Sequence, residues 1–488
     1  MLGFREQVAQ WQTRRQFLKR CQTGLGAIAL SSLIGRRAIA SPPVAHAPGS
    51  PLAPKPPHFP AKAKRVIYLH MSGAPPQHDL FDYKPKLVEN HLKPCPDELL
   101  KGARFPFIKG HPKLLGTPYK FQPHGQSGAL VSELLPFFSQ HVDEVAFVKS
   151  MWTDQFNHAP AELFLYTGSP RNGGAGMGSW VTYGLGSENQ DLPGFVVLIS
   201  GGTDPTGGKA LWSTGYLPSV YQGVQCRSSG EPILYANNPP GMGRDTRRRS
   251  LDALKALNEL ELQEFGDPET LTRISQYELA FRMQMTVPEV TDLRNEPQRV
   301  LDLYGAVPGA ASFANNVLLA RRLIERGVRY VQLYDWGWDM HGTDKTNDVV
   351  TGLPKKCKEV DRPIAALLTD LKQRGLMDDT LVIWGGEFGR TAMNEERNGS
   401  KFLGRDHHPH CFTIWLAGGG IKPGITFGAT DELGYFVTEG AFAVHDLQAT
   451  ILHLLGLDAW KLTFPFQGLQ QRLIGPEGDA KVRREILA

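Results

Sequence analysis

Short apolar runs alternate along this chain with longer stretches of helical periodicity. The runs are rich in β-branched and aromatic residues, as buried strands are, and they lie at 65–71, 144–149, 195–199, 328–334, 380–384 and 412–416. The helical stretches lie at 251–283, 311–326, 361–374 and 446–455. Strands that alternate with helices predict an α/β fold with a mostly parallel central sheet and helices on both faces.

Such a sheet binds its ligands beyond the carboxyl ends of the strands, and acidic and histidine residues occupy these positions here. The segments with such residues are 78–82 after the first strand, with His78, Asp79 and Asp82; 335–342 after 328–334, with Asp335, Asp339 and His341; 385–390 after 380–384, with Glu387; and 404–410 just before 412–416, with Asp406, His407, His408 and His410. One Asp or His at a strand end is often a cap or turn residue. Four such segments at one edge instead predict a site for one or two divalent ions, such as Zn, Mn, Fe, Ca or Mg.

Composition narrows the class of protein. A hydrophobic content of 41% and a charged content of 21% are typical of a folded globular chain. The net charge of +4 comes from the first 40 residues, which hold seven Lys/Arg and one acid, so the remainder is slightly acidic. No nucleic-acid partner is therefore expected. Apart from Cys21, the four cysteines are widely separated and define neither a disulfide framework nor a zinc site.

The N-terminus resembles an export signal. Residues 13–19 (TRRQFLK) match the twin-arginine pattern, a mildly apolar stretch follows, and residues 38–40 (AIA) have the small-x-small pattern of a cleavage site. An amphipathic helix with a chance Arg pair is the alternative. The apolar stretch is too short and glycine-rich to span a bilayer well. We therefore expect a signal peptide at 1–40, the twin-arginine machinery as a partner, a periplasmic or secreted location, no stable membrane anchor after cleavage, and a Pro/Ala-rich linker at 41–62.

Several common mechanisms are excluded because the motifs that they require are absent from the sequence. The glycines at 202–209 do not have P-loop spacing, and neither HExxH nor GxSxG occurs. AGGG at 417–420 follows a predicted strand but does not have the spacing of a dinucleotide site. Metal chemistry is thus the best-supported of the chemistries considered.

A set of motifs resembles a known family. It comprises SGAPP at 72–76, WDMHG at 338–342, GEFGRT at 386–391, GRDH at 404–407 and AGGG at 417–420. The set is similar to that of a sulfatase-like bacterial family of unknown function, with twin-arginine signals, in the alkaline phosphatase/sulfatase superfamily. The resemblance implies an alkaline-phosphatase-like domain at 63–475, with insertions at about 85–140 and 200–310 and a C-terminal tail at 476–488.

The sulfatase nucleophile motif has a counterpart at 158–168 (HAPAELFLYTG), which keeps its length and its Pro, Leu, Thr and Gly positions. His158 stands where sulfatases have the Cys or Ser that becomes formylglycine, and Glu162 stands where they have Arg. The usual sulfatase mechanism is therefore not expected. His158 is a candidate nucleophile, general acid/base or metal ligand, or it only supports the helix start beside the cap residue Asn157.

The same comparison bears on the other site residues. Glu387 keeps a carboxylate where sulfatases have Asp, whereas Phe388 replaces a ligand. The resemblance implies Asp79, with Asp82 in reserve, in place of the acidic pair after the first strand. It implies Asp339, His341, Asp406 and His407 as the remaining ligands, with His408 and His410 less certain. Arg390 and Arg405 are candidates for holding an anionic ester through paired hydrogen bonds, or they form ordinary salt bridges. The resemblance implies an exported metal-dependent hydrolase of small-molecule or glycan esters of phosphate or sulfate. The alternative is a non-catalytic relative that binds a glycan or a protein partner outside the cytoplasm.

Overall fold

The computed structural model describes residues 50–488 except 102–104, 228–229, 234–237, 239–240, 266–267 and 477–478. The expected signal peptide and residues 41–49 of the expected linker lie outside the described residues. No described helix is long and apolar enough to cross a bilayer.

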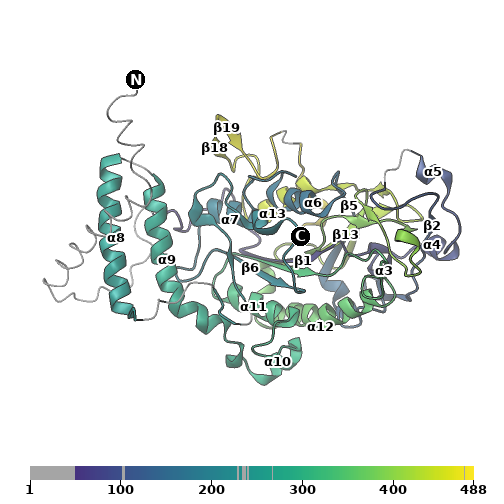
Figure 1. Ribbon diagram of the computed structural model, residues 1–488, viewed down its shortest axis with the longest axis horizontal. Helices are drawn as coiled ribbons and strands as arrows, with labels where there is room; N and C mark the ends of the chain where they lie inside the picture. The colour runs from purple at the N-terminus through teal and green to yellow at the C-terminus, as the bar shows by residue number, and fades with distance from the viewer. Residues whose placement is uncertain are drawn as a thin grey trace.

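A large central sheet organises the molecule (Figure 1). Its strand order is β14-β5-β13-β9-β1-β8-β6-β7, and β17 also pairs with β5. The strands are β1 (Arg65–Ser72), β5 (Val145–Trp152), β6 (Phe195–Ser200), β7 (Val224–Gln225), β8 (Tyr330–Trp336), β9 (Thr380–Gly385), β13 (Phe412–Ala417), β14 (Ile425–Phe427) and β17 (Phe442–Ala443). All six predicted strands are present in this sheet.

Strand direction determines which segments meet. β13 pairs antiparallel with both β9 and β5, and every other recorded pairing in the sheet is parallel. Within the described residues, β13 is thus the one strand of this sheet that runs against the rest. Its first residue therefore lies at the edge where the neighbouring strands end, so the segment before β13 reaches that same edge.

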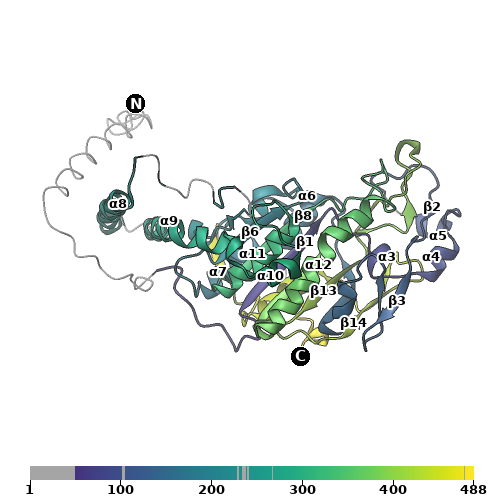
Figure 2. The ribbon, with the colours of Figure 1, turned by 90° about the horizontal axis from the view of Figure 1, so that it is seen from below.

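Helices cover both faces of the sheet, which confirms the predicted α/β class (Figures 1 and 2). One face carries α10 (Gln298–Tyr304), α11 (Phe313–Glu325) and α12 (Gly352–Gln373), and the other carries α6 (His158–Thr167), α7 (Met177–Leu185) and α13 (Val444–Leu454). The single helical stretch expected at 251–283 is instead two helices, α8 (Arg244–Phe265) and α9 (Pro268–Thr291), which pack against each other at one end of the molecule. Proline at the first position of α9 suits a helix start, because its missing N–H needs no partner there.

Short elements occupy the loops. They are α3 (Gln77–Leu80), α4 (Pro85–Glu89), α5 (Asp97–Leu100), β2 (Lys113–Leu114) with β11 (Met393–Asn394), β3 (Phe121–His124) with β4 (Ala129–Ser132), β10 (Gly389–Arg390) with β12 (His407–His408), β15 (Ala429–Thr430) with β16 (Val437–Glu439), and β18 (Phe464–Phe466) with β19 (Leu469–Gln471). The cysteines at 95, 226, 357 and 411 are buried and free.

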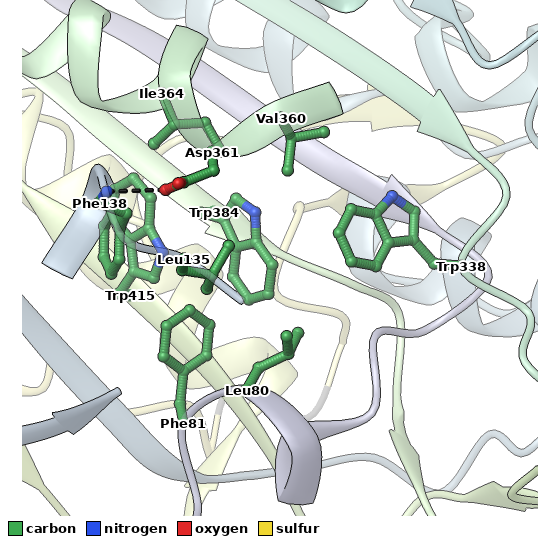
Figure 3. A pocket seen from close by; sticks show the side chains of 10 residues that line it. All are labelled: Leu80, Phe81, Leu135, Phe138, Trp338, Val360, Asp361, Ile364, Trp384 and Trp415. Carbon is green, nitrogen blue, oxygen red and sulfur yellow. Dashed lines mark hydrogen bonds between the residues drawn. The ribbon is translucent and has the colours of Figure 1, made fainter. Parts of the chain in front are cut away.

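An apolar pocket lies between α12 and the sheet (Figure 3). Its lining includes Leu80, Phe81, Trp338, Trp384, Trp415 and the carboxylate of Asp361. Asp361 accepts hydrogen bonds from the backbone N–H groups of Phe137 and Phe138 at 2.9 and 2.7 Å. Asp361, the one charged residue of the lining, therefore already has hydrogen-bond partners within the protein. The pocket is an apolar packing space and not a candidate active site.

Candidate metal centre

Three segments bring imidazole and carboxylate groups to the carboxyl edge of the sheet. α6 begins at His158 shortly after β5 ends, and the Asn157 side chain caps it by accepting from the His158 N–H at 3.0 Å. The loop after β8 carries Asp339 and His341. His407 lies in β12, where it pairs with Arg390 of β10, just before the reversed strand β13.

The four side chains form a tight cluster, in which His158, His341 and His407 point their Nε2 atoms at one oxygen of Asp339. The Asp339 Oδ1 atom lies 3.2 Å from His158 Nε2, 2.8 Å from His341 Nε2 and 3.5 Å from His407 Nε2. The Nε2 atoms of His341 and His407 lie 3.2 Å apart. A tetrahedral zinc site with bonds of about 2.0–2.1 Å has its ligand atoms about 3.4 Å apart, so these spacings fit one ion.

The opposite nitrogen of each ring has its own partner. His158 Nδ1 donates to Glu387 Oε1 at 2.5 Å, and His407 Nδ1 donates to the Phe156 carbonyl at 2.8 Å. His341 Nδ1 contacts the Glu395 carboxylate, which also bonds Arg397. Arg397 Nη2 lies 3.1 Å from the same His341 nitrogen, but the carboxylate is closer and fixes the tautomer. With hydrogen on each Nδ1, a ring that releases its Nε2 proton presents a lone pair to the cluster, as metal-bound histidines do.

The electrostatics of the cluster reflect its four close groups. Burial opposes the charge on His158, but the carboxylates of Asp339 and Glu387 outweigh burial and raise the pKa of His158 to about 9. Burial, helped by Arg390 and opposed by Asp339, lowers the pKa of His407 to about 4. Burial also opposes ionisation of Asp339, but Arg390 and the imidazoles hold its pKa well below the ordinary range. Asp339 thus stays ionised, as a metal ligand must.

Arg390 is buried and its donors are used inside the protein. Its guanidinium donates to the carbonyls of Gly73 at 2.5 Å, Ala74 at 3.0 Å and Arg405 at 3.0 Å, and it also contacts Asp339. These bonds tie three loops together beneath the cluster. The same Asp339 side chain is 24% exposed, whereas the three imidazoles are at most 9% exposed, so the cluster opens to solvent at Asp339.

The structure places the remaining candidates outside this cluster. Asp79 forms a fully buried, two-pronged ion pair with Arg405 at 2.7 and 3.2 Å. Asp406 accepts the N–H groups of Phe107, Ile108 and His407 at 2.8–3.0 Å. Its carboxylate fixes backbone around the site, and so helps to place His407.

The reserve candidates also have other partners. Asp82 accepts from the Thr430 hydroxyl at 2.5 Å and pairs with Lys84 at 3.2 Å. His408 points to the other side of its strand, stacks on Tyr435 and bonds its carbonyl at 2.6 Å. His410 packs beside His408 and Phe436.

Sequence reasoning did not find Glu395, Phe156 or Phe107 as neighbours of the cluster. The Phe107 ring meets His341 and His407 edge-on, with centroids 5.1 and 5.6 Å apart, and Arg397 lies over it. These residues belong to loops without a periodic pattern. One signal was available elsewhere: His70 is a polar residue inside the apolar run of β1.

The protein is thus an α/β protein with a mostly parallel sheet and a His₃Asp cluster beyond the ends of its strands. The chain belongs to the family described as "Protein of unknown function (DUF1501)", whose model matches residues 63–487. No protein of curated function matches the chain significantly.

Solved structures of low identity are similar to the chain. The lipoteichoic acid synthase LtaP from Listeria monocytogenes is 11% identical, with a TM-score of 0.35, over 87% of this chain and 78% of LtaP. The PsFucS1 sulfatase from Pseudoalteromonas sp. is 12% identical, with a TM-score of 0.35, over 81% of this chain and 68% of its own. The phosphonate monoester hydrolase SpPMH from Silicibacter pomeroyi is 12% identical, with a TM-score of 0.34, over 88% and 76%. Likeness at this level bears on neither activity nor substrate.

Proposed function

We propose that this protein is a metal-dependent hydrolase of phosphate or sulfate esters, exported by the twin-arginine route. The observation that carries the proposal is the convergence of three Nε2 atoms and the Asp339 carboxylate at the carboxyl edge of the sheet. Imidazole-rich sites favour Zn, Mn or Fe over Ca or Mg. A bound divalent ion supplies a Lewis acid that polarises an ester oxygen and activates water.

The chain's own residues then divide the work. His158, His341, His407 and Asp339 hold the ion. Glu387, Glu395 and the Phe156 carbonyl orient the three rings, as outer partners of metal-bound histidines do. Both nitrogens of His158 face partners, which favours a ligand role over that of nucleophile. Arg390 positions Asp339 and its loop, because its donors are spent on carbonyls and on Asp339 itself.

The ester class rests on charge and on the sequence motifs. An ion beside the partly exposed Asp339 gives an anionic ester a cationic partner at the open side of the cluster. The resemblance of 338–342, 386–391 and 404–407 to sulfatase-like motifs supports the same class. Small-molecule and glycan esters both remain within it.

The test begins with the metal content of the mature chain, purified without chelator. The chain is then assayed with p-nitrophenyl phosphate, bis-p-nitrophenyl phosphate and p-nitrophenyl sulfate in the presence of Zn²⁺, Mn²⁺ or Mg²⁺. We expect metal-dependent turnover that His341→Ala abolishes and His445→Ala, a histidine bonded to the Gly168 carbonyl, leaves intact. A chain that holds metal and turns over none of these esters would favour the non-catalytic binding role.

A further inference from the structure

A second cluster of ionisable side chains lies deeper in the protein. It consists of His70 in β1, Glu162 one turn into α6 and Glu387 after β9, and all three side chains are fully buried. None of the three belongs to the His₃Asp set. We call this triad the inner cluster and the His₃Asp set the outer cluster.

The inner cluster contains buried polar atoms that make no hydrogen bond within the described residues. Both ring nitrogens of His70, Oε1 of Glu162 and Oε2 of Glu387 are buried and have no hydrogen-bond partner among the described residues. The other oxygen of each carboxylate is used: Glu162 Oε2 accepts from the Gly207 N–H at 2.6 Å, and Glu387 Oε1 accepts from the Gly73 N–H at 3.0 Å. One free oxygen from each glutamate thus faces His70. Leaving such buried groups unpaired is unfavourable, and more so when they are charged.

The spacings fit a metal better than a hydrogen bond. His70 Nε2 lies 3.3 Å from Glu387 Oε2 and 3.6 Å from Glu162 Oε1. A strong N–H to carboxylate hydrogen bond spans about 2.7–2.9 Å, whereas two ligands of one tetrahedral zinc lie about 3.4 Å apart. Three protein donors are also the number used by zinc sites that keep one position open.

The carboxylate oxygens of Glu162 and Glu387 lie within 4.8 Å of each other in a fully buried place, where a divalent cation would offset their charge. The rings around His70 are uncharged: those of Tyr166 and Tyr334 each lie 5.3 Å from it, centroid to centroid. Uncompensated charge in such surroundings is strongly unfavourable.

We propose that His70, Glu162 and Glu387 bind a second divalent transition-metal ion, such as Zn²⁺ or Mn²⁺, distinct from the ion of the outer cluster. Glu387 links the two places, because Oε2 faces His70 while Oε1 accepts from His158 Nδ1. The inner ion therefore fixes the carboxylate that orients an outer ligand. The inner cluster does not depend on the proposed hydrolase activity, since none of its atoms opens to solvent.

The test counts ions in variants that address one cluster at a time. Glu162→Gln removes a charge from the inner cluster, keeps the side-chain shape and leaves an oxygen for the Gly207 N–H. His407→Ala removes a ligand from the outer cluster only. Each variant and the full-length parent are loaded with Zn²⁺, freed of excess metal and measured by mass spectrometry of the metal and by calorimetric titration. Asp361→Asn, a buried carboxylate outside both clusters, is the matched control.

We expect two ions in the parent and in Asp361→Asn, and one in each of the other variants. A parent with one ion that Glu162→Gln keeps and His407→Ala loses would overturn the inner site while leaving the proposed function intact. A parent with one ion that His407→Ala keeps and Glu162→Gln loses would overturn the outer site instead. If Glu162→Gln fails to fold, His407→Ala decides alone: one remaining ion supports the inner site, and none overturns it.

Discussion

The Nε2 atoms of His341 and His407 face each other across 3.2 Å, while their Nδ1 atoms are held by Glu395 and by the Phe156 carbonyl. Two neutral rings held in this way point lone pair at lone pair. A cation between them turns this repulsion into two bonds, so metal and fold should stabilise each other.

Metal removal should therefore destabilise the protein. A ligand that binds only the folded chain adds about 2.7 kcal/mol to the free energy of unfolding at a concentration one hundred times its Kd. We expect chelator treatment to lower Tm and Zn²⁺ to restore it, as followed by differential scanning calorimetry. In His341→Ala the Zn²⁺-induced rise should be clearly smaller. An equal rise in both proteins would place the stabilising ion elsewhere.

Glu395→Gln should weaken the outer metal without removing a ligand. Glu395 contacts His341 Nδ1, and the loss of such an outer partner typically costs 10–100-fold in metal affinity. Chelator competition measures this change. The neighbouring Glu396, which pairs with Lys113 at 3.2 Å, is the control, and Glu396→Gln should leave the affinity unchanged.

Gly404→Ala should displace the segment that carries His407. A Cβ atom at Gly404 would lie 2.0 Å from the carbonyl carbon of His341. The two loops would therefore have to move apart. We expect a loss of about 1–3 kcal/mol in the free energy of unfolding, as for overpacked sites, together with weaker metal binding. Gly243→Ala, where a Cβ would meet nothing within 4 Å, should change neither quantity. Unaltered metal binding in Gly404→Ala would show that the close contact between the loops of Gly404 and His341 is not needed for the metal site.

The pH dependence of stability should change in Glu144→Gln. The hydrogen bond from His141, with a second from Lys372, lowers the pKa of Glu144 from 4.5 to about 2. A carboxyl group whose pKa falls on folding stabilises the protein when the pH is above the pKa that the group has in the unfolded chain. This stabilisation is lost as the pH drops from about 4.5 towards 2. Because Glu144 is partly exposed, we expect an effect of less than about 1 kcal/mol.

Urea unfolding of parent and variant at pH 7, 4.5 and 3 tests this prediction. The variant should be less stable at pH 7, and the difference should shrink at pH 3. A Glu144→Gln difference that grows in acid would contradict the assignment.

The sequence predicted the sheet because its strands are apolar runs that end at glycines and polar residues. It also predicted Asp339, His341 and His407 as neighbours, since each adjoins a strand end or strand start. The reversal of β13 was not predictable from these runs, yet only that reversal brings the segment before the strand to the shared edge.

Other relationships depended on packing between distant loops. Asp79 follows a strand as Asp339 does, but it forms a buried ion pair with Arg405 and does not join the metal cluster. Glu395 stands in a loop with no periodicity, and its contact with His341 follows only from how that loop folds back. Helical periodicity at 251–283 did not show where one helix ends and the next begins.

The two clusters draw their side chains from one end of the chain to the other, from His70 near its start to His407 near its finish. During synthesis, no complete set of outer ligands exists until His407 has left the ribosome. Loading of the proposed ions is then a late event that follows synthesis of most of the chain. Since the twin-arginine route carries proteins already folded, an exported form of this protein would take its ions from the cytoplasm rather than from the medium it enters.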